Sequence, residues 1–284
     1  MSHDLQSSFL TTPAGHKLQY LSTAKKATPL ICLHGLGGST NTFLPLHPEI
    51  PSNFRFIAVD FPGFGQSQLS NSAPPASVSG YVADLHHLVT SLQADPSQPA
   101  NKIVLFGHSL GAVVALHYAA SYPDAVVGLG LLGAGRAAGH IPAAKERMLR
   151  LATGVREKGT QFAADLATKT NFYEDSEDRS VDPALKERVR AEVAASVPEA
   201  YAQAAEAMVA ADHSDPDYTQ IKCPTVFVAG DKDMISPVER SSGLSELVGG
   251  DSWVEVVKSG HQPILEDSAA TIAALSKLLK KVQT

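Results

Sequence analysis

The chain has 284 residues, 44% of them hydrophobic and 18% charged, with a formal net charge of −6 at pH 7. This length accommodates one large domain with an insertion and a sizeable core. Because the charge balance is acidic, we expect neither nucleic acid nor an anionic membrane as a partner. No apolar run approaches the roughly 18 residues of a membrane span, and the N-terminus lacks the pattern of a signal peptide. We therefore expect a cytoplasmic protein in which Cys32 and Cys223 are reduced.

The predicted elements begin with a hairpin, because Pro13-Ala14-Gly15 separates the runs Phe9–Thr11 and Leu18–Leu21. Further along, short apolar runs alternate with stretches of helical period. The expected strands are Leu30–Leu33, Phe54–Val59, Ile103–Phe106, Val126–Leu132, Thr225–Ala229 and Trp253–Val257. The expected helices are Val78–Leu92, Leu110–Ser121, Val238–Leu247 and Ile264–Leu279. This alternation predicts an α/β fold, with a mostly parallel central sheet and helices on both faces.

The composition of the sequence changes between Arg136 and Asp217. Alanine-rich, charged stretches of helical period follow one another there, and no apolar run typical of a strand lies between them. Several of these stretches begin with Pro or Asp-Pro, which suits a first helical turn. The alternation of strands and helices resumes at Cys223. We predict a core made of residues 1–135 and 218–284, and a helical cap at residues 136–217. Ligands of open parallel sheets bind at the carboxyl ends of the strands, so the cap is expected to cover that edge.

A serine lies between two glycines where a predicted strand meets a predicted helix, in Gly107-His108-Ser109-Leu110-Gly111. A strand–turn–helix context is the one in which G-x-S-x-G exposes a nucleophile on a strained turn. The alternative is that Ser109 has only a structural role in the turn, because glycine and serine are common turn residues. We favour a nucleophilic Ser109, because the helix that starts behind it supplies unpaired N–H groups.

Two backbone amides are candidates to bind the oxyanion of a tetrahedral intermediate. The first is the amide of Leu110, at the start of the helix behind Ser109. The second is the amide of Leu36, in the glycine-rich segment "HGLGG" that follows the strand Leu30–Leu33. A phosphate-binding loop is the other interpretation of that segment, but the lysine of a P-loop and the G-x-G-x-x-G spacing are both missing.

A serine nucleophile needs a base, and the base needs an acid to orient it. Of the 11 histidines, His261 is the best candidate, because it lies between the last predicted strand and the final helix. The segment "VAGDKDMISP" after the strand Thr225–Ala229 offers Asp231 and Asp233 as the acid. The alternative for either aspartate is a solvated turn residue. The chain order of serine, aspartate and histidine is the one found in α/β-hydrolases.

The segments "HGLGG", "VDFPGFGQS", "GHSLG", "GDKDMISP" and "SGHQPILED" resemble, in order and spacing, those of the α/β-hydrolase superfamily over essentially the whole chain. The resemblance implies that Ser109 is the nucleophile, His261 the base and Asp233 the acid, since the acid stands third after such a glycine. It also implies that the amides of Leu36 and Leu110 form the oxyanion hole. The insertion resembles the cap of 3-oxoadipate enol-lactonases and their relatives, although Leu-Gly-Ala follows the serine where those enzymes have Met-Gly-Gly.

The resemblance implies a serine hydrolase that cleaves a small carboxylic ester or lactone through an acyl-enzyme. Alternatives with the same triad are a C–C bond hydrolase of the meta-cleavage type and a perhydrolase. A ligand receptor on the same fold, with negligible turnover, is a further alternative. Epoxide hydrolases and dehalogenases are set aside, because they carry an aspartate at the position of Ser109.

Three further residues are candidate substrate contacts: Arg136, His34 and His108. Arg136 begins the cap, where it could pair with a substrate carboxylate through two hydrogen bonds. A salt bridge between cap and core is an equally good interpretation of Arg136. His34 and His108 belong to motifs that shape the backbone on either side of the site. We expect a small-molecule substrate and neither a cofactor nor a metal, and we leave open a homodimer.

Overall fold

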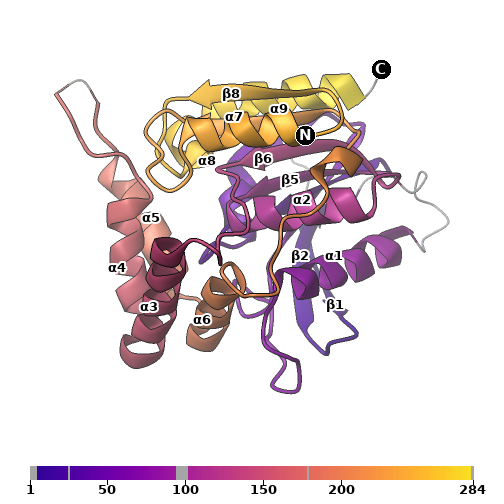
Figure 1. Cartoon of the computed structure of the whole chain (residues 1–284). Coiled ribbons are helices and arrows are strands. Elements are labelled where there is room, and N and C mark those ends of the chain that lie inside the picture. The colour runs from indigo at the N-terminus through magenta and orange to yellow at the C-terminus, as the bar shows by residue number, and fades with distance from the viewer. Residues whose placement is uncertain (1–4, 25, 94–101, 178, 283–284) are drawn as a thin grey trace.

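One eight-stranded sheet forms the centre of the computed structural model, which describes residues 5–24, 26–93, 102–177 and 179–282. The strand order is β1-β2-β4-β3-β5-β6-β7-β8 (Figure 1). The strands are β1 Leu5–Thr11, β2 Lys17–Thr23, β3 Thr28–Leu33, β4 Phe54–Val59, β5 Ile103–His108, β6 Val126–Leu132, β7 Thr225–Gly230 and β8 Ser252–Val257. The β1–β2 hairpin and its pairing with β4 are antiparallel, and all other neighbours are parallel. The predicted mostly parallel sheet is confirmed.

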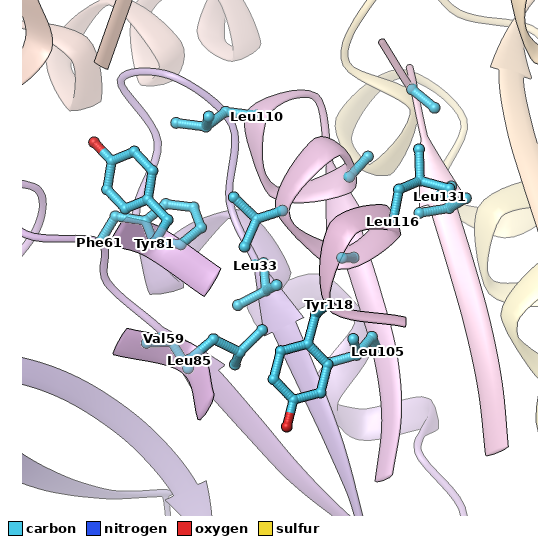
Figure 2. Close-up of a cluster of buried hydrophobic side chains, with 14 of the residues drawn as sticks. Leu33, Val59, Phe61, Tyr81, Leu85, Leu105, Leu110, Leu116, Tyr118 and Leu131 are labelled. Atoms are coloured by element: carbon cyan, nitrogen blue, oxygen red, sulfur yellow. The ribbon is translucent and has the colours of Figure 1, made fainter. Parts of the chain in front are cut away.

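Helices cover both faces of the sheet. Successive side chains of a strand point to opposite faces, and in these strands the side chains on both faces are apolar and need to be buried. Along β3, Ile31 and Leu33 belong to one buried cluster and Leu30 and Cys32 to the other. The first cluster joins the sheet to α1 (Val78–Gln93), α2 (Leu110–Ser121) and α7 (Val238–Leu247), and Figure 2 shows part of it. The second joins it to η1 (Thr40–Glu49) and α9 (Ser268–Val282). This packing holds the strand ends in fixed register, which is what a site at their carboxyl edge requires.

The prediction of one helix over Ile264–Leu279 is wrong. The structure divides it into α8 (Pro263–Glu266) and α9, with Asp267 extended between them at φ −140° and ψ 66°. The Asp267 carboxylate accepts hydrogen bonds from the amides of Ala270 (3.2 Å) and Lys258 (2.9 Å). An aspartate that caps a new helix competes with continuation of the old one, and apolar periodicity alone does not reveal that competition.

The described part of the segment predicted as a cap contains four α-helices: α3 Pro142–Lys158, α4 Thr160–Thr170, α5 Pro183–Ala194 and α6 Pro198–Ala207. Figure 1 shows them gathered beside the sheet, on the side toward which the β8 arrow points. Glycines in the loops after three strands pack closely against this helical insertion. A Cβ on Gly37 would lie 2.8 Å from Val193, one on Gly63 would overlap Ala200, and one on Gly260 would lie 2.7 Å from the amide of Tyr173. The insertion therefore covers the carboxyl ends of the strands.

Two further features concern the described part of the chain. Cys32 and Cys223 are both buried, free thiols, and burial raises their pKa values, that of Cys223 to about 11. None of the described helices combines the length and apolar character needed to cross a membrane.

Replacing Asp267 by alanine is expected to destabilise the fold by about 1–2 kcal/mol, because the cap of α9 and the bond to Lys258 are both lost. Urea denaturation followed by circular dichroism measures this free energy of unfolding. The matched control is Asp251→Ala, which removes an exposed ion pair with Lys281 and should cost less than about 0.5 kcal/mol. Equal losses in the two variants would contradict the capping role of Asp267.

Candidate active site

Ser109 lies at the turn between β5 and α2, with φ 51° and ψ −111°. It is the one non-glycine residue with positive φ among the described residues, a conformation that costs free energy in an L-residue. The surrounding structure compensates: the Ser109 amide donates to the carbonyl of Leu132 (2.8 Å). A Cβ on Gly107 would overlap the carbonyl of Gly111, and one on Gly111 would overlap the carbonyl of Leu33. The two glycines therefore permit a sharp turn that raises Ser109 above the sheet edge.

The loop after β3 packs directly against this turn. A Cβ on Gly35 would lie 3.1 Å from the Cβ of Ser109, so the next residue, Leu36, is held close to the serine. The amides of Leu36 and Leu110 donate no hydrogen bond to any other described residue. Backbone N–H groups without a protein partner are able to donate a hydrogen bond to a bound ligand. These two amides therefore suit a developing negative charge beside Ser109.

His261 and Asp233 form a buried pair at the carboxyl edge of the sheet. His261 Nδ1 lies 2.7 Å from Asp233 Oδ2, and both side chains are almost fully buried. The other carboxylate oxygen, Asp233 Oδ1, accepts from the amides of Ile235 and Ser236, both at 2.8 Å. Because a carboxylate only accepts, Nδ1 of His261 carries the proton and Nε2 is left with a lone pair. A neutral imidazole in this tautomer can accept a proton from a serine hydroxyl.

The electrostatics of this pair favour an ionised carboxylate. Burial raises the pKa of Asp233, but the charge of His261 and the hydrogen bonds from His261, Ser236 and Ile235 outweigh it, so the net pKa lies below the usual value. Asp233 is therefore negative at neutral pH and stabilises the imidazolium that forms when His261 takes a proton.

The backbone around His261 is fixed by residues that the sequence patterns did not single out. The His261 amide donates to the carbonyl of Asn171 in the insertion (2.7 Å). The Glu266 carboxylate accepts from the amides of Gly260 and Gln262 at 3.0–3.1 Å. Gly133, at φ 54°, leaves room for the ring, because a Cβ there would lie 2.8 Å from His261 Cε1. Position near His261 in the chain could have indicated Glu266, but nothing in the sequence indicates Asn171.

The two histidines predicted as substrate contacts, His34 and His108, form hydrogen bonds with backbone groups instead. His34 is fully buried; its Nε2 accepts from the amide of Phe61 (2.9 Å) and its Nδ1 donates to the carbonyl of Gly35 (2.7 Å). His108 Nε2 donates to the carbonyl of His261 (2.7 Å). Burial lowers the pKa of His34 to about 4, and burial together with the charge of His261 lowers that of His108 to about 3. Both rings are neutral and engaged, so we correct their role from substrate binding to positioning.

Arg136 lies where the chain enters the insertion, and it forms a salt bridge with Asp215, which belongs to the same predicted segment 136–217 rather than to the core. Its Nε donates to Asp215 Oδ2 (2.8 Å), near the point where the chain leaves the insertion. Asp215 also accepts from the amide of Ala137 (2.9 Å) and the hydroxyl of Tyr218 (3.0 Å). This arrangement joins the two connections between core and insertion. A substrate carboxylate would have to displace Asp215, so the structure does not place Arg136 in a free binding site.

Asp231 is an exposed turn residue, as the alternative for one of the two aspartates predicts, and its carboxylate also makes specific contacts. Its carboxylate binds the Arg179 guanidinium of the insertion at 2.8 and 2.9 Å and accepts from the amide of Ser259 (3.0 Å). Asp231 therefore links the insertion to the loop that carries His261, while Asp233 contacts His261 itself.

Two cavities lie apart from this site. One, of about 320 Å³, is bordered by His117, Ser121 and residues 212–217, and the other, of about 450 Å³, by Tyr81, Asp84 and residues 74–77. Neither is lined by the serine, the histidine or the aspartate described above. The described residues contain no group of three or more His, Cys, Asp or Glu side chains arranged to hold a metal ion.

The strand order, the insertion after β6 and the serine at the sharp turn after β5 define an α/β-hydrolase fold. The chain belongs to the alpha/beta hydrolase family, whose family model matches residues 30–275.

Relatives in sequence include esterases and lipases. A pimeloyl-[acyl-carrier protein] methyl ester esterase from Shewanella sp. (strain MR-7) is 38% identical over 120 residues, 42% of this chain and 39% of that protein. Lipase 1 of Psychrobacter immobilis is 27% identical over 93% of this chain and 80% of that protein. A serine hydrolase-like protein of Danio rerio is 36% identical over 104 residues, 37% of this chain, and the match spans only 30% of that relative's length.

Solved structures superpose over nearly the whole chain. A thermophilic esterase from Thermogutta terrifontis matches with a TM-score of 0.84 and 29% identity, covering 98% of this chain and 100% of the other. The enol-lactonase from Burkholderia xenovorans LB400 matches with a TM-score of 0.80 and 18% identity, over 96% of this chain and 100% of the other. At that identity the enol-lactonase shows a common fold. The predicted α/β-hydrolase superfamily is confirmed.

Replacing Arg136 by alanine is expected to lower kcat/KM by the same factor for carboxylate-bearing lactones and for neutral esters, because Arg136 is paired with Asp215. Parallel kinetics on one substrate of each type measure the ratio. The control Asp215→Asn removes the other half of the same bridge and should leave that ratio unchanged. A selective loss on the carboxylate-bearing substrate in Arg136→Ala alone would restore the substrate-binding role.

Proposed function

We propose that this protein hydrolyses a carboxylic ester or lactone through an acyl-enzyme formed on Ser109. The observation that carries this proposal is the combination of a buried, correctly oriented Asp233–His261 pair with two unengaged amides beside the strained serine. This set contains a nucleophile, a base, an orienting acid and an oxyanion site, which are the parts that acyl transfer requires.

The proposed reaction follows from these positions. The Ser109 hydroxyl oxygen attacks the substrate carbonyl carbon while His261 Nε2 accepts its proton. The carbonyl oxygen becomes an oxyanion that the amides of Leu36 and Leu110 stabilise. The intermediate collapses, and His261 returns the proton to the departing alkoxide. Water then attacks the acyl-enzyme with His261 as base, which releases the carboxylic acid and regenerates Ser109.

The relatives support an ester rather than another bond. The Thermogutta structure is named an esterase and the Shewanella relative a methyl ester esterase, and both exceed 25% identity. A lactone is an internal ester and undergoes the same attack, so the proposal includes both. Hydrolysis of p-nitrophenyl acetate and of a series of short esters and small lactones tests the substrate class. Absence of turnover on all of them would contradict the proposal.

Replacing Ser109 by alanine should remove nearly all turnover, leaving about 10³-fold acceleration over water from the oxyanion amides and substrate binding. The fold should persist, because alanine also fits the space of the serine side chain, and circular dichroism verifies this. Labelling of the wild type by a fluorophosphonate, and its absence in the variant, reports on the nucleophile directly. A variant that kept a tenth of the wild-type kcat would contradict the mechanism.

The two aspartates of the loop after β7 are expected to differ sharply. Asp233→Asn keeps the shape but favours the wrong tautomer of His261, so kcat should fall by up to about 10⁴. Asp231→Asn loses the ion pair with Arg179 and keeps an acceptor for the Ser259 amide, so its kcat should fall less than about tenfold. Steady-state kinetics on the two variants measure the difference. An impaired Asp231→Asn beside a nearly normal Asp233→Asn would reverse the assignment.

A further inference from the structure

The loop that carries the Leu36 amide is clamped by the helical insertion as well as by the core. The Ser39 hydroxyl, at the end of this loop, donates to the carboxylate of Glu192 in α5. One turn earlier in the same helix, the Arg188 guanidinium donates to the carbonyl of Asn41 (2.7 Å). The insertion therefore makes polar contacts to two residues that follow the oxyanion amide.

Apolar contacts from the insertion reach the oxyanion amide's own neighbours. The Leu36 side chain packs against the small buried cluster of Ala152, Ala202 and Ala205 from α3 and α6. Gly37, at φ 80°, lies against Val193, which immediately follows Glu192. The loop itself is rich in glycine and has little conformational preference of its own. The conformation of this loop is therefore determined by its contacts with the insertion and with the core.

Glu192 is placed to act on Ser39, through the hydroxyl and the backbone amide of that residue. The Ser39 hydroxyl oxygen accepts from the amide of Asn41 (3.2 Å), which directs the hydroxyl proton toward Glu192. Burial raises the pKa of the Glu192 carboxyl, the nearby charge of Asp60 acts in the same direction, and the Ser39 hydrogen bond and the charge of Arg188 oppose them. On the core side, Asp60 accepts from the amide of Thr40 (2.6 Å). Ser39 and Thr40 are thus held by two acidic side chains, Glu192 from the insertion and Asp60 from the core.

We propose that Glu192 is a positioning residue of the oxyanion hole, which holds Ser39 so that the Leu36 amide stays directed at the carbonyl attacked by Ser109. The oxyanion hole is then complete only when α5 is docked on the loop after β3. This inference rests on the proposed hydrolase activity. The competing role for Glu192 is simple attachment of the insertion to the core, with no effect on the transition state.

The two roles differ in the kinetic constant that they change. Loss of one oxyanion donor costs about 10²–10³ in kcat, and loosening the donor should cost part of that, about 10- to 100-fold. Glu192→Leu removes the acceptor and should lower kcat by this factor with KM within about threefold of the wild type. Glu192→Gln keeps an acceptor for Ser39 and should restore kcat to within about threefold. The matched control is Glu187→Leu, an exposed position of the same helix, which should leave both constants unchanged.

Two further measurements separate positioning from attachment. A trifluoromethyl ketone that adds to Ser109 forms a tetrahedral oxyanion, so its affinity should fall in Glu192→Leu by about the same factor as kcat/KM. In a double-mutant cycle, Glu192→Leu should cost less in Ser39→Ala than in the wild type, because the hydrogen bond from the Ser39 hydroxyl is already lost and only the contact with the Ser39 amide remains. Ser39→Ala alone should show the kcat loss, which keeps the test valid if Glu192→Leu does not fold.

The outcomes are distinguishable. An active wild type with an unchanged kcat in both Glu192→Leu and Ser39→Ala would overturn the positioning role and leave the hydrolase proposal intact. A rise in KM alone, with an unchanged trifluoromethyl ketone affinity, would assign Glu192 to attachment of the insertion. A wild type without esterase or lactonase turnover would remove the proposed function and this inference with it.

Discussion

The close approach of the β5–α2 turn to β3 is the constraint on which the site depends. Gly111 touches the carbonyl of Leu33, and Gly35 touches the side of Ser109, so side chains larger than hydrogen would separate these segments. The positive φ of Ser109 is tolerated because this packing leaves the turn no alternative. The same contact that strains the serine also brings the loop of Leu36 beside it. The proposed nucleophile and the proposed oxyanion donors are thus positioned by one packing interaction.

The helical insertion contributes to the site from two sides. On the first side, the carbonyl of Asn171 and the guanidinium of Arg179 hold the loop that carries His261, the latter through Asp231. On the second, Glu192 binds Ser39 in the loop of the oxyanion amide. The core alone therefore supplies the proposed reacting groups, whereas the insertion contacts three of the four loops that carry them. A covering element that also positions catalytic loops couples access to the site with its geometry.

The buried titratable groups around Ser109 are of two kinds: the neutral rings of His34 and His108, and the ionised carboxylate of Asp233. His34 and His108 are kept neutral by burial, and each donates or accepts only to the backbone. Asp233 is kept ionised by the charge of His261 and by hydrogen bonds that offset its burial. The negative charge of Asp233 is thus placed where the proposed mechanism forms an imidazolium, and the neutral rings of His34 and His108 do not compete with it.

The sequence by itself determined the strands, the turn at Ser109 and the pairing of an aspartate after β7 with His261, because these depend on local periodicity, glycine spacing and chain order. Prediction from the sequence failed where a tertiary contact determines the structure. The helix breaks at Asp267 because this carboxylate binds the amide of Lys258, and His34 and His108 are neutral because they are buried. Only the tertiary structure brought Asn171, Arg179 and Glu192 to the site, because each acts across 52 to 153 residues of chain that no local pattern spans. Hydrogen bonds between distant segments leave no period in a sequence, so they become visible only when the fold has placed their partners together.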